Sequence, residues 1–288
     1  MNIRNLLCVV LASMLICCAQ ETRKNKPANM GASRIGSYDF EHPQVFDMPV
    51  VLNEISGITF HNGNPDRLYA EQDEEGVLYS LKLGSKEVNK TKFHKKGDFE
   101  DVQILHDRVL VLRSDGAIFS FPFAETTGTK TGEVIVSEGM VPTGEYEAMF
   151  ADQEPAKVYV LCKSCGEKPR SSTSGFIFTI DDKGLFVPAG KFTINADGIA
   201  AKPGKKKMAL EPSALGRNPV TREWFILSSV NKMLVIADAN WAIKSVVKLD
   251  ASLYNQPEGL AFDNKGNLYI SNERGSLQSA TVLKVSRR

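Results

Sequence analysis

The sequence predicts an all-β protein, folded as a β-propeller. After residue 36 no stretch shows the sustained apolar period of a long amphipathic helix. Short β-branched and aromatic runs bounded by turn residues recur instead, and a unit that opens on an acidic residue repeats along the chain. Hydrophobic residues make up 42% and charged residues 24%, which is typical of a globular protein and excludes disordered and multi-span membrane chains.

The first 18 residues predict an export signal. Arg4 precedes a 13-residue run, Leu6 to Cys18, that is too short to span a bilayer comfortably. The run ends in Leu-Ile-Cys-Cys, which resembles a bacterial lipobox with Cys18 as the lipidated thiol. Cys17 occupies the position where a small residue is usual, so an ordinary signal peptide is the alternative. Residues 19–36 are polar and aperiodic, as expected for a flexible tether.

The repeating unit predicts five propeller blades. Each copy has an acidic residue, an apolar strand, a turn, a second strand, a hairpin and a third strand. The copies open at Glu54, Glu100, Glu147, Glu211 and Glu258. Their separations are 46, 47, 64 and 47 residues, which suits four-stranded blades. We attribute the long interval to insertions at 163–175 and 197–208, and a degenerate sixth blade is the alternative.

The chain ends predict how the ring closes. The last repeat stops after its third strand, and the unmatched segment 38–52 can supply the missing outer strand. Sharing one blade between the two termini would remove an exposed edge. Residues 37–288 are therefore expected to form a single propeller domain.

An ordered series of motifs resembles the SdiA-regulated family. The segments that carry the resemblance are Leu52–Ile58, Gln72–Glu74, Gly97–Glu100, Arg113–Gly116, Pro212–Ala214, Gln256–Gly259 and Leu268–Glu273. The resemblance implies an exported or membrane-anchored β-propeller of unassigned activity, related more distantly to NHL-type propellers. One departure is Asp101, where the family pattern has Gly, and it is expected to crowd or further acidify the rim.

The glutamates that open the repeats predict a carboxylate ring. In a propeller the innermost strands line the channel, so Glu54, Glu100, Glu147, Glu211 and Glu258 would face one axis. Repelling carboxylates need protonation, hydrogen-bond partners or a cation, and Ca²⁺ is the natural candidate. The alternative, which we favour, is that each glutamate caps backbone N–H groups of the next blade. Asp98, Asp101 and Glu145 add charge nearby.

A second acidic group lies in the hairpins 72–75, 114–115 and 272–273. Asp73 and Glu74 are weak candidates for a general base, although such residues also simply favour tight turns. The basic loop Lys205–Lys207 is expected to be solvated.

Cys162 and Cys165 are the two cysteines outside the signal, and a local disulfide or free thiols are expected. Zinc would need two more soft ligands, and no second cysteine pair exists among the 5 cysteines.

Charge and missing motifs limit the function. Lys and Arg number 35 against 34 Asp and Glu, so nothing predicts nucleic-acid binding. Nucleophile elbows, phosphate loops and His-Glu-x-x-His are absent from the sequence. The leading prediction is a noncatalytic envelope protein that binds a small ligand, a glycan or a protein. The alternative is a Ca²⁺-assisted hydrolase of an ester, lactone or phosphate.

Overall fold

The computed structural model describes residues 29–30, 34–166, 172–181, 183–199 and 209–288. The signal, most of the tether and the Lys205–Lys207 loop lie outside the described residues. Within them, helical structure is confined to four 3-10 turns, at Val50–Leu52, His61–Gly63, Phe123–Thr127 and Ala196–Gly198. No helix of that part of the chain is long and apolar enough to cross a membrane.

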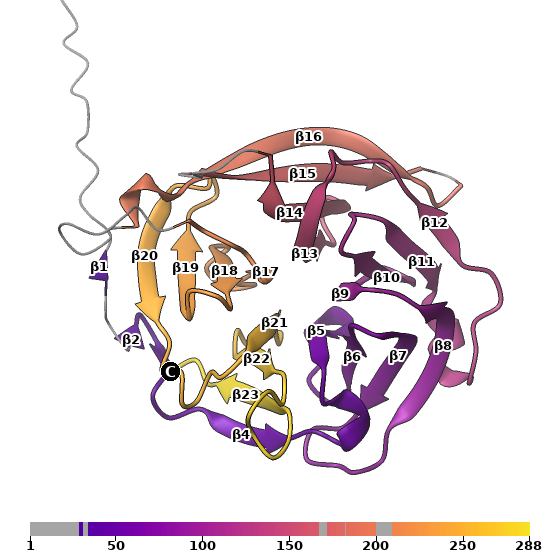
Figure 1. Ribbon diagram of the computed structural model, residues 1–288, viewed down its shortest axis with the longest axis horizontal. Helices are drawn as coiled ribbons and strands as arrows, with labels where there is room; N and C mark the ends of the chain where they lie inside the picture. Colours follow the sequence, from indigo (N-terminus) through magenta and orange to yellow (C-terminus); the bar gives the residue numbers. More distant parts are fainter. Residues whose placement is uncertain (1–28, 31–33, 167–171, 182, 200–208) are drawn as a thin grey trace, which may run out of the picture.

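Five four-stranded antiparallel blades form a ring (Figure 1), which confirms the predicted all-β propeller. Blade 1 contains β5 (Ile55–Phe60), β6 (Leu68–Gln72), β7 (Glu75–Leu81) and β8 (Asn89–Lys96). Blade 2 contains β9 (Phe99–Leu105), β10 (Arg108–Arg113), β11 (Ile118–Pro122) and β12 (Ile135–Ser137). Blade 3 contains β13 (Gly144–Asp152), β14 (Lys157–Cys165), β15 (Ser172–Ile180) and β16 (Phe186–Asn195). Blade 4 contains β17 (Ala214–Arg217), β18 (Trp224–Ser228), β19 (Met233–Ala237) and β20 (Ile243–Lys248).

Blade 5 joins the two ends of the described chain. It contains β21 (Pro257–Phe262), β22 (Leu268–Asn272), β23 (Thr281–Val285) and, as its outer strand, β4 (Gln44–Asp47). β4 pairs antiparallel with β23, from Asp47 opposite Thr281 to Gln44 opposite Lys284. The predicted closure by N- and C-terminal strands is therefore confirmed.

Three further short strands add to the five four-stranded units, and one of them, β1, is a fifth strand on the outer edge of blade 4. β1 (Asn29–Met30) pairs in parallel with β20, and β2 (Arg34–Ile35) pairs with β3 (Tyr38–Asp39). No sheet in the described residues forms a sixth blade. The predicted insertion at 163–175 is shorter than expected, because β14 extends to Cys165 and β15 begins at Ser172.

The hydrophobic core consists of five clusters, each between two neighbouring blades. One cluster packs Phe225 of blade 4 against Leu260 and Leu283 of blade 5. Every blade is thus buried on both faces, which explains why the second strands consist largely of consecutive apolar residues. Polar residues at the starts of the innermost strands lie near the central channel.

Two glycines allow the innermost strands to approach each other closely. A Cβ on Gly57 would lie 2.5 Å from the Asp101 Cα atom, and a Cβ on Gly259 would lie 2.3 Å from the Ser56 carbonyl oxygen. Any larger residue at either position would push two blades apart.

Asp101 joins blade 2 to blade 3. Its buried carboxylate accepts hydrogen bonds from the Val102 N–H at 2.8 Å and from the Met149 N–H of the next blade at 2.7 Å. The acid that departs from the family pattern therefore neither crowds the rim nor adds exposed charge to it. Asp101 links neighbouring blades through backbone hydrogen bonds, which is the role that the sequence analysis favoured for the glutamates.

Candidate functional site

The five innermost strands surround the centre of the ring (Figure 1). Their last residues line one common cavity, so their starts lie together at the other end of the central channel, which we call the acidic mouth. The hairpin after each second strand reaches the same end, because the two strands are antiparallel: Ile55 pairs with Gln72, and Pro257 with Asn272. The two acidic groups predicted from the sequence therefore share this mouth.

The strand register divides the predicted glutamate ring into two tiers. The inner tier lies at the mouth end of the paired part of each innermost strand and comprises Ser56, Glu100, Glu147, Ser213 and Glu258. The outer tier lies two residues nearer the mouth and comprises Glu54, Asp98, Glu145, Glu211 and Gln256. Glu100, Glu147 and Glu258 are thus equivalent positions, whereas Glu54 and Glu211 belong to the outer tier and serines replace them in the inner one.

A third set of side chains comes from the hairpins. This hairpin tier comprises Asp73, Ser114, Ser229 and Glu273, which follow second strands, and Lys163, which lies near the mouth-side end of β14. It forms the side-chain contacts of the mouth: Ser229 Oγ donates to Glu258 Oε1 at 2.9 Å, and Lys163 forms an ion pair with Glu147. In the outer tier, Gln256 Nε2 donates to Glu273 Oε2 at 2.7 Å.

In the part of the chain that the structure describes, the inner-tier glutamates do not accept hydrogen bonds from backbone N–H groups of the next blade, although the sequence analysis favours that role for them. Among the described residues, Glu147 and Glu258 contact side chains, and no hydrogen bond of the Glu100 carboxyl group is formed. Carboxyl groups in a confined, partly dry channel must then either protonate or acquire a cation.

The electrostatics of the mouth reflect this crowding. Burial, followed by the charges of Glu147 and Asp98, raises the pKa of Glu100 to about 10. Burial and the charge of Glu258 raise the pKa of Glu273 to about 8. Burial and the charge of Glu147 raise the pKa of Glu258 to about 7. Without a bound cation, the mouth therefore holds protons at neutral pH.

Lys163 is the one basic residue in the three tiers, and the sequence analysis missed it. Burial alone would lower the pKa of Lys163, but Glu147, Glu258 and Glu100 raise it, so the ammonium stays charged. Lys163 lies between Cys162 and Cys165, which the structure joins in a disulfide with a Cα–Cα distance of 6.0 Å. The disulfide closes a small loop around the residue that neutralises Glu147.

Replacing Lys163 with methionine should destabilise the fold by about 2 kcal/mol at pH 8, because Glu147 would lose its buried partner. The loss should shrink at pH 5, where Glu147 can take up a proton: burial raises the pKa of Glu147, so protonation there costs little. Urea denaturation at both pH values measures this. Lys244→Met is the matched control, because its exposed pair with Glu223 is worth about 0–1 kcal/mol. Equal losses in the two variants would contradict the assigned role.

Asp73 and Glu74, the weak candidates for a general base, differ in their surroundings. Asp73 lies in the hairpin tier, where burial and the charge of Glu54 raise its pKa and its Oδ1 atom is buried without a hydrogen-bond partner. Glu74 is exposed beside it. The structure also shows Glu71, which the sequence analysis passed over: its Oε1 accepts from the Gly57 N–H at 2.6 Å, while its buried Oε2 has no partner. Burial raises the pKa of Glu71 well above its usual range.

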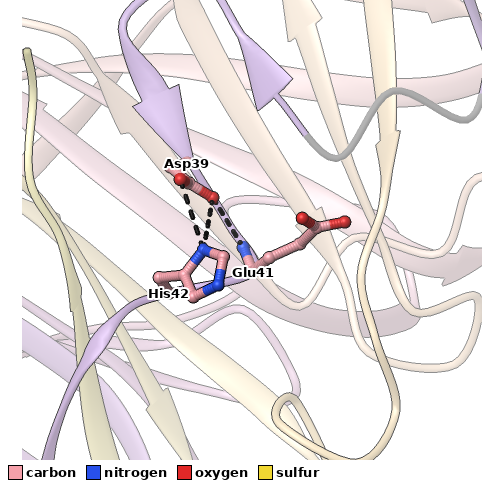
Figure 2. Close-up of side chains that lie close together, drawn as sticks. All are labelled: Asp39, Glu41 and His42. Atoms are coloured by element: carbon pink, nitrogen blue, oxygen red, sulfur yellow. Dashed lines mark hydrogen bonds and ion pairs between the residues drawn. The ribbon is translucent and has the colours of Figure 1, made fainter.

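A separate acidic group lies on the outside of the ring. Figure 2 shows Asp39, Glu41 and His42, whose potential ligand atoms lie within 4.8 Å of one another. The Asp39 carboxylate accepts from the Glu41 N–H at 3.2 Å and from Arg288 Nη2 at 3.3 Å, and it contacts His42 Nδ1 at 3.4 Å. These contacts stabilise the negative charge of the Asp39 carboxylate without a metal ion.

Comparison with known proteins supports the fold and the family resemblance. The sequence profile of the SdiA-regulated family matches residues 187–277. The resemblance to the SdiA-regulated family is confirmed. The matched segment runs from β16 through all of blade 4 to the hairpin after β22, so it includes Glu211, Glu258 and Glu273. No curated protein matches the sequence.

Solved structures with a similar backbone are β-propellers. Myxococcus xanthus glutaminyl cyclase has a TM-score of 0.50 and 13% identity, over 85% of this chain and 95% of that one. Regucalcin from Agrobacterium tumefaciens, described as a calcium-binding protein, has a TM-score of 0.49 and 12% identity, over 84% and 92% of the chains. A luciferin-regenerating enzyme has a TM-score of 0.48 and 12% identity, over 85% and 80%. Identities this low indicate a shared fold and leave the activity open.

Proposed function

We propose that this chain is a noncatalytic binding protein whose acidic mouth takes a cationic ligand. The observation that carries the proposal is the imbalance of the mouth. Among the described residues, the partly buried carboxyl groups of Glu100, Glu258 and Glu273 have raised pKa values, and Lys163 is the one basic side chain in the three tiers. A ligand that brings positive charge would let Glu100, Glu258 and Glu273 release their protons and would gain their full attraction.

The geometry favours an extended cation over a directly coordinated metal ion. Among the described residues, Asp39, Glu41 and His42 are the only three or more acidic, His or Cys side chains whose ligand atoms lie within 4.8 Å of one another. The carboxylates of the mouth are more widely spaced, so three of them do not meet around one Ca²⁺ in this arrangement. Amino or guanidino groups on a small molecule, a glycan or a protein suit the mouth better, and Lys163 already occupies it as an ammonium group.

Calorimetric titration with spermidine and with CaCl₂ tests the proposal at low and high salt. We expect spermidine to bind more tightly than Ca²⁺ and to displace protons, with a signal that depends on the buffer's ionisation enthalpy. Glu273→Gln should weaken binding about tenfold, equivalent to about 1.4 kcal/mol. Glu87→Gln is the control, because Glu87 is exposed in the loop between β7 and β8 at the other end of the blade. Absence of binding, or an equal effect of the two variants, would refute the proposal.

A second function, hydrolysis, has one observation in its favour. The raised pKa values of Glu258 and Glu273, about 7 and about 8, lie in the range that suits a general acid or base at neutral pH. Ester, lactone and phosphate substrates, each assayed with Ca²⁺ and with chelator, distinguish the two functions. Turnover that is lost in Glu258→Gln would replace the binding proposal with the catalytic one.

We further propose that the protein is exported and held at a membrane of the cell envelope by lipid on Cys18. The support is the apolar run and the Leu15 to Cys18 motif. Cys18→Ser should move the protein from the membrane fraction to the soluble one, and mass spectrometry of the native N-terminus should find a diacylated cysteine. A native N-terminus at another residue, without acyl chains, would contradict the anchor.

A further inference from the structure

The channel has a second opening, opposite the acidic mouth. A cavity of about 420 Å³ lies there, lined by the far ends of all five innermost strands, β5, β9, β13, β17 and β21. Its volume is within the range of small-molecule sites. Apolar residues are part of its lining: Phe150 and Phe262 are half-buried, and Phe60 and Ile104 are buried in the cores behind it.

Two arginines and one aspartate form the polar part of this wall. Arg217 Nη1 lies 2.6 Å and Arg222 Nη2 lies 3.2 Å from the same oxygen, Oδ2 of Asp152. The Asp152 side chain is 7% exposed, that of Arg217 is 17% exposed and that of Arg222 is 50% exposed. One carboxylate thus holds two guanidinium groups, so this group of three side chains carries one net positive charge.

The surrounding structure holds the arginines in place. The Arg217 guanidinium lies 4.9 Å from the Trp224 ring centroid, and its Nε donates to the Arg222 carbonyl at 3.2 Å. Arg222 has a positive φ of 60°, an unusual conformation for a residue with a side chain, and its N–H donates to the Asn218 carbonyl at 2.9 Å. Asn218 is fully buried, and its Oδ1 accepts from the N–H groups of Val220 and Thr221. The turn that presents Arg222 is therefore well ordered by its own hydrogen bonds.

Both guanidinium groups keep donors for a ligand. Among the described residues, no acceptor contacts Arg222 Nε or Nη1, or Arg217 Nη2. Two other acids border the cavity. Asp263 is fully engaged by its own turn, with donors from Lys265, Asn267 and Tyr269, and Glu154 is exposed at the rim.

We propose that this cavity binds a small molecule with an oxyanion group and an apolar body. The open donors of Arg217 and Arg222 would together hold the carboxylate or phosphate, since guanidinium groups form charge-assisted hydrogen bonds with either group. The aromatic wall would cover the apolar body. This site shares no residue with the acidic mouth and does not depend on the function proposed for it.

Ligand-observed NMR and calorimetry with three probes of one shape test the site: benzoate, phenyl phosphate and uncharged benzyl alcohol. We expect at least one of the two anions to bind at least tenfold more tightly than benzyl alcohol, and the stronger anion identifies the oxyanion. Equal affinity for benzyl alcohol would mean an apolar cavity without anion recognition. Failure of both anions to bind at millimolar concentration would also overturn the proposal.

Variants locate the binding. Arg222→Gln should weaken anion binding at least tenfold and keep the fold, because Arg217 still pairs with Asp152. Glu154→Gln should tighten it about twofold by removing a rim charge, a change of opposite sign that loss of folding cannot imitate. Arg274→Gln, an exposed arginine on the hairpin after β22, should change nothing. An Arg222→Gln protein that melts normally and binds as tightly as the parent would contradict the assignment.

Discussion

Replacing Glu100 with glutamine should make the protein more stable at alkaline pH. In the folded state burial and the neighbouring carboxylates raise the pKa of Glu100 from 4.5 to about 10. The folded protein therefore keeps a proton that the unfolded chain releases, and stability is lost as the pH rises between these two values. One such proton changes the free energy of unfolding by about 1.4 kcal/mol per pH unit.

Glutamine imitates the protonated acid, so the variant should match the parent near pH 5 and exceed it by up to about 4 kcal/mol at pH 8. Urea denaturation across this range measures the difference in slope, with Glu87→Gln as control. Spermidine at saturation should reduce the difference, because the cation stabilises the ionised form. Parallel pH profiles for parent and Glu100→Gln would show that Glu100 is already ionised and paired.

Deleting residues 37–50 should abolish the cooperative fold. The deletion removes β4, the outer strand of blade 5, and with it the buried side chains of Tyr38, Phe40 and Met48. Each buried side chain of this size contributes about 2–3 kcal/mol, and together they approach the whole stability of a typical domain, about 5–15 kcal/mol. The Tyr38 hydroxyl also donates to the Gly266 carbonyl at 2.6 Å, so the deletion removes a hydrogen bond to the turn between β21 and β22 of blade 5.

Size-exclusion chromatography and thermal melts followed by circular dichroism measure the outcome. We expect aggregation through the exposed edge of β23 and no cooperative transition. Deletion of residues 19–28, which precede β1, is the control and should leave the melting temperature unchanged. A soluble 37–50 deletion that melts within a few degrees of the parent would show that the ring is closed by other contacts.

The blade count could be predicted from the sequence because each blade repeats one local pattern of strands and turns. The tiers of the mouth could not. Ladder irregularities occur near the mouth, between Ile55 and Ile58 in blade 1 and between Pro257 and Leu260 in blade 5. These irregularities fall at the same place in both blades, which makes Ser56 the equivalent of Glu258. Aligning the repeats on their leading acid instead placed Glu54 with Glu258.

Contacts between distant residues explain what else was missed. Asp152 meets Arg217 and Arg222 across 65 and 70 positions of the chain, and no local motif links them. Lys163 was treated as part of an insertion, yet the extended β14 carries it to the channel. The Asp152 group forms only when the ring brings blades 3 and 4 together, whereas Lys163 and Glu147 meet within blade 3.

The closure of blade 5 also sets the order in which the molecule can be completed. β4 is made early, but its partner β23 comes more than two hundred residues later. During synthesis, every other blade can pair its four strands from contiguous chain, whereas β4 stays unpaired until β23 has been made. A chain truncated before Thr281 lacks β23, so β4 keeps an unpaired edge. Chaperones and proteases can recognise this exposed edge and so distinguish incomplete chains from complete ones.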